Sequence, residues 1–207
     1  SFHVTGVQTC ALPILDFFRN NTSLQFIDGN KVPDFHGKTT GAVLGGRSVC
    51  AAPFDGRKLG KELKRLRQPL DVISLWGMGI ASGNDIKQFF NSTSSISSFL
   101  YVTRRVLRHF KDLIVYGQGT QLVNGNALVA GLAQSAFDKD VSIITNASVK
   151  QLNKEGPSIT GVTVEINGSL QQIHASKGVV LACGGFPHDD HRKSVMFAHA
   201  PKIGRAH

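Results

Sequence analysis

Glycine-rich stretches that follow apolar residues are the first candidates for chemistry, because such loops can bind phosphate groups at the start of a helix. The residues Val72–Leu75 resemble a strand and precede Gly77-Met78-Gly79-Ile80-Ala81-Ser82-Gly83. This spacing fails as a dinucleotide-binding fingerprint, since the third glycine would fall on Ser82 and Gly83 delays the following helix. An acidic residue about 20 positions further on, in a second strand, is also missing. The sequence therefore predicts an ordinary loop at this place.

A second glycine pair, Gly184-Gly185, ends the wholly apolar run Gly178–Ala182. A short run without a polar face predicts a strand that is covered on both sides, as in a parallel sheet. Glycines at the end of such a strand let a cofactor approach the backbone, because they lack a Cβ atom. An ordinary strand-to-helix turn is the alternative.

The run His188-Asp189-Asp190-His191 has the composition of a metal site. Four consecutive residues rarely converge on one ion, however, and these follow Pro187 and precede a helical stretch. We expect the acids to cap that helix and to offset its dipole. The sequence thus assigns no metal site, gives none of the isolated histidines a catalytic role, and leaves the catalytic residues unknown.

The composition is that of a globular domain. Of 207 residues, 41% are hydrophobic and 18% are charged, and no apolar run approaches the ~20 residues that would span a bilayer. Outside the N-terminal stretch, the only thiols are Cys50 and Cys183, which lack metal-site or disulfide spacing. A reducing, cytoplasmic setting fits this cysteine usage.

The formal net charge of +9 is concentrated in two runs, Lys58–Arg67 and Arg104–Lys111. A basic chain can bind nucleic acid or an anionic membrane. The aromatic-flanked stretch of a single-strand binder is absent, so we expect no nucleic-acid partner. The second run lies on a predicted helix, Ser95–Ile114, whose apolar residues recur at helical spacing. We expect its other side, with Arg104, Arg105, Arg108 and Lys111, to be a solvated face; attraction of an anionic cofactor or peripheral association with a membrane are the alternatives.

The chain changes character near Tyr116. Before it the pattern predicts a short helix, a strand, a glycine-rich loop and three further helices, at 15–20, 24–27, 37–46, 58–66, 85–91 and 95–114. After it the pattern predicts a helix at 126–138, strands at 141–145 and 148–152, a hairpin of 159–166 with 171–175, and the strand 178–182. The hairpin is turned at Asn167-Gly168, a dipeptide that tolerates positive φ angles.

The two ends do not read like natural protein. Val4–Ile14 and Ile203–His207 resemble translations of the adapter oligonucleotides used in short-read sequencing, which suggests a metagenomic source. Such segments carry no fold information. We expect residues 1–14 and 203–207 to be a non-native leader and tail around an internal fragment, residues 15–202.

Several stretches together resemble the later part of the FAD-binding domain in the fumarate reductase and succinate dehydrogenase flavoprotein superfamily. They are Asn124–Leu128, Val141–Ile143, Ala147–Val149, Ile159–Val162 and Lys177–Phe186. Gly46–Ser48 and Pro53–Gly60 are most similar to the 3-ketosteroid Δ1-dehydrogenase branch of that superfamily.

The resemblance implies an α/β fold: a partial FAD-binding domain, Rossmann-like and of the glutathione-reductase type, with a β-hairpin or meander and a helical insertion. Residues 15–120 would be the helical insertion on the substrate side, and residues 121–202 the later part of the FAD-binding domain. The implied cofactor is FAD, with Ser148, Val149, Ala182, Cys183, Gly184 and Gly185 as its contacts. Cys183 stands where the family more often has Thr or Ala, so it is interpreted as a small buried filler rather than a redox thiol.

The implied activity is oxidation at a CH–CH bond of a cyclic ketone, steroid-like or other, by abstraction of an α-proton and transfer of a hydride to the flavin. The alternatives are a fumarate reductase-like ene-reductase and a flavin-free binding or structural relative. The tyrosines Tyr101 and Tyr116 lie outside the family's catalytic motifs, so neither receives a catalytic role.

Overall fold

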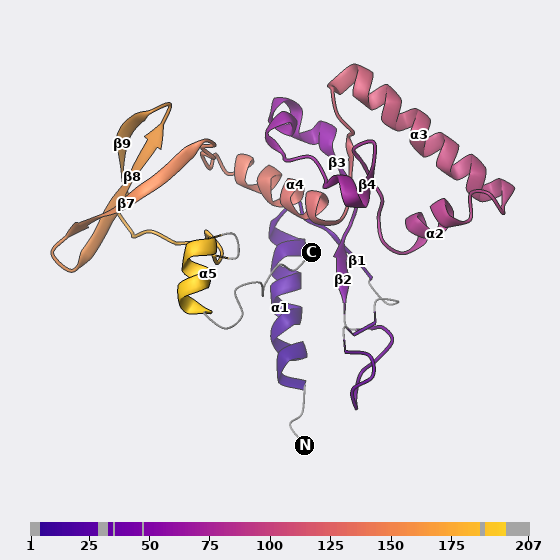
Figure 1. Cartoon of the computed structure of the whole chain (residues 1–207), viewed down its shortest axis with the longest axis horizontal. Coiled ribbons are helices and arrows are strands. Elements are labelled where there is room, and N and C mark those ends of the chain that lie inside the picture. Colours follow the sequence, from indigo (N-terminus) through magenta and orange to yellow (C-terminus); the bar gives the residue numbers. More distant parts are fainter. Residues whose placement is uncertain (1–4, 29–32, 35, 47, 187–188, 198–207) are drawn as a thin grey trace. The chain divides into compact units, whose positions relative to one another are not determined.

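The computed structural model describes residues 5–28, 33–34, 36–46, 48–186 and 189–197, and the chain divides into two compact units, Ser1–Ser142 and Ile143–His207. The first unit contains α1 (Thr5–Asn21), β1 (Phe26–Asp28), β2 (Val49–Ala51), β3 (Phe54–Asp55), the 3₁₀ segments η1 (Gly56–Arg65) and η2 (Asp71–Ile73), β4 (Ser74–Leu75), β5 (Met78–Gly79), α2 (Asn84–Phe90), α3 (Ile96–Tyr116), β6 (Gln121–Leu122) and α4 (Asn124–Phe137) (Figure 1). The second contains β7 (Ala147–Glu155), β8 (Ser158–Ile166), β9 (Ser169–His174) and α5 (Asp190–Met196).

The core of the first unit lies between α4, η1 and the antiparallel pair β3–β6. The buried residues that form it are Phe54, Leu59, Leu63, Leu122, Ala127 and Ala130. The small side chains of Ala127 and Ala130, with exposed fractions of 1% and 0%, let the neighbouring strands approach α4 closely. The predicted helices at 58–66 and 126–138 are therefore present, the first in 3₁₀ form.

The helix α3 packs against α2 with its polar side, which corrects the expected orientation. Its buried residues are Ser98, Arg105, His109 and Asp112, whereas the apolar residues Ile96, Phe99, Leu100, Leu107, Phe110 and Ile114 are exposed. Arg104, Arg108 and Lys111 are exposed as expected, but Arg105 is only 8% exposed. The inversion is stable in this unit because the inward polar groups find partners in one another and in the backbone.

The loop that mimics a dinucleotide fingerprint is a tight hairpin, which confirms its rejection. β4 and β5 pair antiparallel, Ser74 opposite Gly79 and Leu75 opposite Met78. The two residues between them, Trp76 and Gly77, both have left-handed backbones, with φ of 51° and 79°. Such a turn reverses the chain and leaves no helix start at the glycines.

The second unit contains a three-stranded antiparallel meander in the order β7–β8–β9. The predicted turn at Asn167-Gly168 is confirmed, with φ of 51° and 78°. β7 lies at the edge of this sheet and has a register shift between Val149 and Gln151.

Two predicted strands are wrong. The residues 141–145 and 178–182 are not in strands in the structure. A parallel strand pairs with a strand that is distant in the sequence, whereas the two strands of a hairpin pair with each other. The hairpin could therefore be predicted from local sequence, and the two parallel strands could not. The helix α1 also begins at Thr5, ten residues before the expected start at Leu15, and it contains Pro13.

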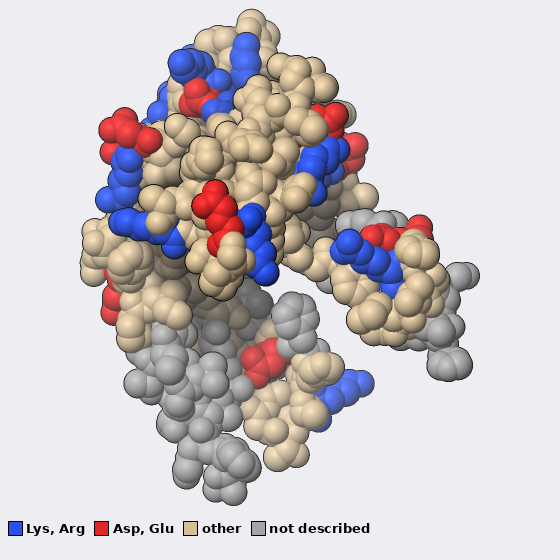
Figure 2. Space-filling view, turned by 90° about the vertical axis from the view of Figure 1, so that its left-hand side faces the viewer, with Lys and Arg blue, Asp and Glu red and all other residues tan. Residues whose placement is uncertain are grey.

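Charges of both signs are interspersed on the surface. Figure 2 shows acidic side chains beside basic ones across the face it displays, so the positive charge does not gather into one continuous patch there. None of the helices that the structure describes is long and apolar enough to cross a membrane.

Candidate functional site

Ser148 and Val149 lie at the start of the edge strand β7. They pair with Glu165 and Val164 of β8, and both are exposed. Because β7 pairs on one side only, backbone N–H and C=O groups along its other side point away from the sheet. Such groups are able to hydrogen-bond a ligand, and the contact of Ser148 and Val149 with FAD stays a prediction.

The other four predicted contacts, Ala182, Cys183, Gly184 and Gly185, lie in an exposed segment without regular secondary structure. Gly184 has a φ of +71°, a conformation that L side chains rarely adopt, and no heavy atom lies within 4 Å of the place a Cβ would occupy. The open space and bare backbone fit the approach of a cofactor. Cys183 is exposed, so its interpretation as a buried filler is wrong: the strand expected to bury it does not form.

The capping role predicted for the acids after Pro187 is confirmed. Asp189 is the N-cap of α5, with its Oδ1 accepting a hydrogen bond of 2.9 Å from the backbone N–H of Arg192, and Asp190 lies in the first turn. His188 lies outside the described residues. Among the described residues no three His, Cys, Asp or Glu side chains are grouped so that they could hold a metal ion.

A cavity of about 550 Å³ in the first unit is the feature that the sequence did not reveal. Its walls come from the end of η1 and the following loop, the β4–β5 hairpin, the inner side of α3, and the start of α4. The apolar lining residues are Leu66, Leu70, Ile73, Met78, Leu122, Val123 and Val129. This volume is in the usual range of small-molecule sites. The only signal in the sequence was the glycine-rich loop, since Gly77 and Gly79 line the cavity as a hairpin.

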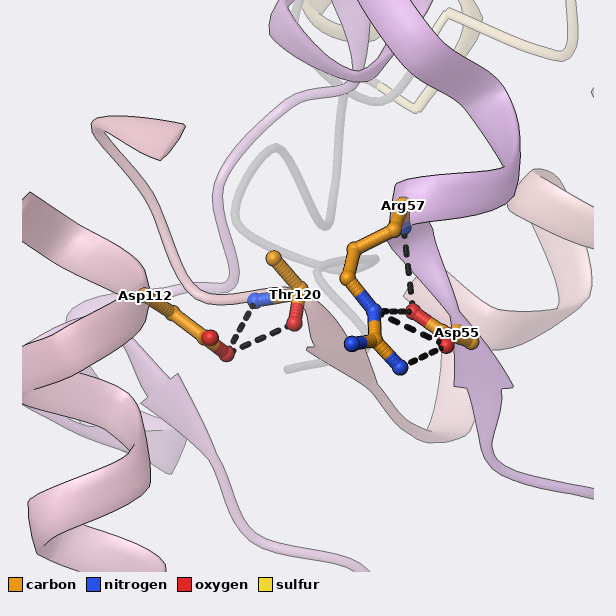
Figure 3. A network of polar contacts seen from close by, with 4 residues as sticks. All are labelled: Asp55, Arg57, Asp112 and Thr120. Carbon is orange, nitrogen blue, oxygen red and sulfur yellow. Dashed lines mark hydrogen bonds and ion pairs between the residues drawn. The ribbon is translucent and has the colours of Figure 1, made fainter. Parts of the chain in front are cut away.

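Polar groups on one side of the cavity are fixed by hydrogen bonds. His109 donates from Nε2 to the carbonyl of Trp76 (3.0 Å), which joins α3 to the hairpin. Asp112 accepts with Oδ2 from the backbone N–H and the hydroxyl of Thr120, at 3.2 and 2.6 Å (Figure 3). Gln118 donates from Nε2 to the carbonyl of Leu63 (2.7 Å). The wall is therefore preorganised by the fold itself.

A buried charge network lies behind the same wall. Asp85 of α2 forms an ion pair with Arg105 of α3 (3.4 Å) and accepts hydrogen bonds from the Tyr101 hydroxyl (2.7 Å) and the Ala81 N–H (2.8 Å). Arg105 also donates to the carbonyl of Gly79 at 3.1 Å. Burial, together with the hydrogen bond to Asp85, raises the pKa of Tyr101. Tyr101 is thus a hydrogen-bond donor within the fold, to the carboxylate of Asp85.

A second cavity, of about 440 Å³, shares the lining residues Arg108 and Asp112 of α3 with the first and is strongly basic. Arg57, Arg104, Arg108 and Lys111 are among its lining residues. Arg57 forms a bidentate pair with Asp55, which Figure 3 shows beside Asp112 and Thr120. Hydrogen bonding by Arg57 holds the pKa of Asp55 below its usual value, and the same pairing raises the pKa of Arg57.

Comparison with known proteins gives a consistent picture. A family model described as "FAD binding domain" matches residues 7–206. The 4-oxocyclohex-2-ene-1-carboxylate 5-dehydrogenase of Sinomonas cyclohexanicum is 31% identical over 186 residues, 89% of this chain and 31% of that protein. The 3-oxosteroid 1-dehydrogenase of Comamonas testosteroni is 29% identical over 161 residues, 75% of this chain and 28% of that protein.

Among solved structures, the 3-ketosteroid delta1-dehydrogenase from Sterolibacterium denitrificans, in complex with 1,4-androstadiene-3,17-dione, matches with a TM-score of 0.72 and 27% identity. The match covers 90% of this chain and 34% of that one. The chain spans about a third of the length of the curated relatives it matches. The resemblance to the 3-ketosteroid dehydrogenase branch and the mixed α/β fold class are confirmed. The chain belongs to the family described as "FAD binding domain".

Proposed function

We propose that the complete protein is an FAD-dependent dehydrogenase that removes hydrogens from adjacent carbons of a cyclic ketone. The observation that carries the proposal is the structural likeness to a 3-ketosteroid dehydrogenase over 90% of the chain at a TM-score of 0.72. FAD, when bound, would supply the hydride acceptor.

The task of this chain is to bind and position the cofactor. In the proposal, the free edge of β7 at Ser148 and Val149 binds the adenine through the main chain. The segment Ala182–Gly185 lies along the adenosine and pyrophosphate side, where Gly184 leaves room for the cofactor. Residues 15–120 form the substrate side of the domain and residues 121–202 the cofactor side, between a non-native leader (1–14) and tail (203–207).

The substrate class rests on the relatives. One is named for a cyclohexenone carboxylate and another for 3-oxosteroids, and a ring ketone is the feature that these names share. A carbonyl acidifies the neighbouring C–H bond, which makes removal of an α-proton feasible for an ordinary side-chain base. An ene-reductase of the fumarate reductase type is the alternative within the superfamily, and a flavin-free relative is the alternative outside it.

The test is to express the complete reading frame and to measure its flavin content and its products. We expect one FAD per chain and a desaturated product from a cyclic ketone in the presence of an artificial electron acceptor. Turnover of fumarate alone would support the ene-reductase instead. A complete protein that contains no flavin would support the flavin-free alternative.

Peripheral membrane association is proposed from α3. Its exposed apolar residues, with Ile96 and Ile114 more than 80% exposed, are flanked by Arg104, Arg108 and Lys111, a pattern of interfacial helices. Binding of the complete protein to phosphatidylserine vesicles but not to phosphatidylcholine vesicles is the expected result, and its absence would refute the association. The proposed compartment is the cytoplasm, in keeping with the free thiols Cys50 and Cys183.

A further inference from the structure

The cavity of the first unit has an uneven distribution of charge. Four arginines line it, and two of them are neutralised: Arg105 by Asp85 at 3.4 Å and Arg65 by Glu62 at 2.5 Å. Arg67 and Arg108 form no ion pair with any residue that the structure describes. Two guanidinium groups thus border the cavity without a paired carboxylate.

The one carboxylate among the lining residues does not cancel this charge. Asp112 lies one helical turn from Arg108 on α3, but it does not form an ion pair with it, and its Oδ2 accepts two hydrogen bonds from Thr120. The hydrogen bond from Arg57 is the main cause of the lowered pKa of Asp55. The positive charge of Arg108 lowers that pKa too, but by less. The guanidinium of Arg108 therefore remains available to a ligand.

The backbone positions of both arginines are fixed by contacts within the fold. Arg108 lies on α3 between Arg105 and His109. The side chains of these two neighbours hydrogen-bond the carbonyls of Gly79 and Trp76 in the β4–β5 hairpin, which fixes the helix backbone at Arg108. The carbonyl of Arg67 accepts a hydrogen bond of 2.7 Å from the side chain of Asn126 at the start of α4. A backbone that is ordered before the ligand arrives lowers the entropy lost on binding.

We propose that this cavity binds a compact, ring-shaped apolar molecule that carries one carboxylate, and that Arg108 recognises the carboxylate. A volume of about 550 Å³ with mainly aliphatic walls suits the ring, and a guanidinium can bind a carboxylate with two parallel hydrogen bonds. The inference rests on the proposed function, and it narrows the substrate class to keto acids in preference to neutral steroids.

The test compares 4-oxocyclohexane-1-carboxylate with its methyl ester, which has nearly the same shape but no charge. Binding to residues 1–207 is followed by the fluorescence of Trp76. We expect the acid to bind about tenfold or more tightly than the ester, as one lost charged hydrogen bond would give. R108Q should abolish that preference, whereas R104Q should retain it, since Arg104 is exposed on the same helix but does not line this cavity. Equal binding of acid and ester, or equal effects of the two variants, overturns the inference.

The complete protein gives a second readout. There R108Q should raise the KM for the acid about tenfold while the R104Q variant keeps the parental KM. A complete protein that holds FAD and oxidises neutral cyclic ketones without any preference for the acid would overturn this inference and leave the proposed function intact. A complete protein without flavin would overturn the proposed function, while a preference of residues 1–207 for the acid would still support the carboxylate site.

Discussion

The guanidinium of Arg105 lies 3.4 Å from the carboxylate of Asp85, and each side chain is only 8% exposed. The pair joins α3 to α2 and, through the carbonyl of Gly79, to the β4–β5 hairpin. This ion pair holds the polar side of α3 toward the interior of the unit, where it forms one wall of the cavity.

Arg105→Met should destabilise the first unit by about 3–5 kcal/mol, because it leaves the buried Asp85 carboxylate without its counter-ion. The free energy of unfolding is measured by urea denaturation followed by circular dichroism. Arg104→Met is the control: that side chain is exposed, and a change within about 0.5 kcal/mol is expected. Similar costs for the two variants would mean that the pair does not hold the helix.

The stability of the chain should fall at alkaline pH through Tyr101. Its pKa is raised in the folded state by burial and by the hydrogen bond to Asp85, so the folded form holds the phenol proton more tightly than the unfolded form does. This contribution is complete below the unfolded pKa of about 10 and is lost as the pH rises through the folded pKa. Denaturation of the parent and Tyr101→Phe across this range should show a steeper alkaline loss in the parent, and identical slopes would contradict the assignment.

Gly161→Ala should disrupt the β8–β9 pairing. A Cβ at this position would lie 2.2 Å from the carbonyl oxygen of Ile173, a backbone atom that cannot move without breaking the register. We expect a loss of about 1–3 kcal/mol in thermal or urea unfolding of the second unit. Gly125→Ala serves for comparison, since nothing lies within 4 Å of its Cβ position, and it should leave stability unchanged or slightly raised.

Gly184→Val should reduce FAD retention by the complete protein, because its side chain would enter the space proposed for the cofactor and strain a backbone with φ of +71°. Gly178→Val tests the backbone effect alone: that glycine also has a positive φ, of 120°, and open surroundings. Cys183→Ala should have little effect. Flavin released per chain is the measurement, and equal losses in all three variants would remove Gly184 from the cofactor site.

Residues 1–207 alone should show no dehydrogenase activity and should not retain stoichiometric FAD. The described residues contain no strand, glycine loop and helix of the dinucleotide type, the unit that binds pyrophosphate with its helix dipole. Absorbance of the purified chain and an assay with a cyclic ketone check this. Copurification with one flavin per chain would show that the cofactor contacts are concentrated in these residues.

The sequence predicted the elements that local interactions determine. Asn167-Gly168 reverses the chain as expected, and Asp189 caps α5, because both depend on residues within a few positions. The segments 141–145 and 178–182 looked like strands by composition alone, and composition cannot supply a pairing neighbour.

The orientation of α3 and the cavity needed the tertiary structure. The periodicity of apolar residues identified the helix, but the rule that these residues face inward failed. The polar side faces inward because Asp85 forms an ion pair with Arg105 and the carbonyl of Trp76 accepts a hydrogen bond from His109. Neither partner is adjacent in the chain, so no helical pattern could reveal the wall or the arginines left at the cavity.

The chain has a single tryptophan, Trp76, and it lies at the turn of the β4–β5 hairpin. Its carbonyl accepts the hydrogen bond from His109, its ring lies 5.9 Å from that of Phe110, and the residues that follow it line the cavity. Trp76 is 68% exposed and its ring faces that of Phe110, so a movement of the hairpin against α3 would change the environment of the indole. The protein therefore contains its own optical reporter: tryptophan emission reports on the β4–β5 hairpin, whose next residues line the cavity, without an added label.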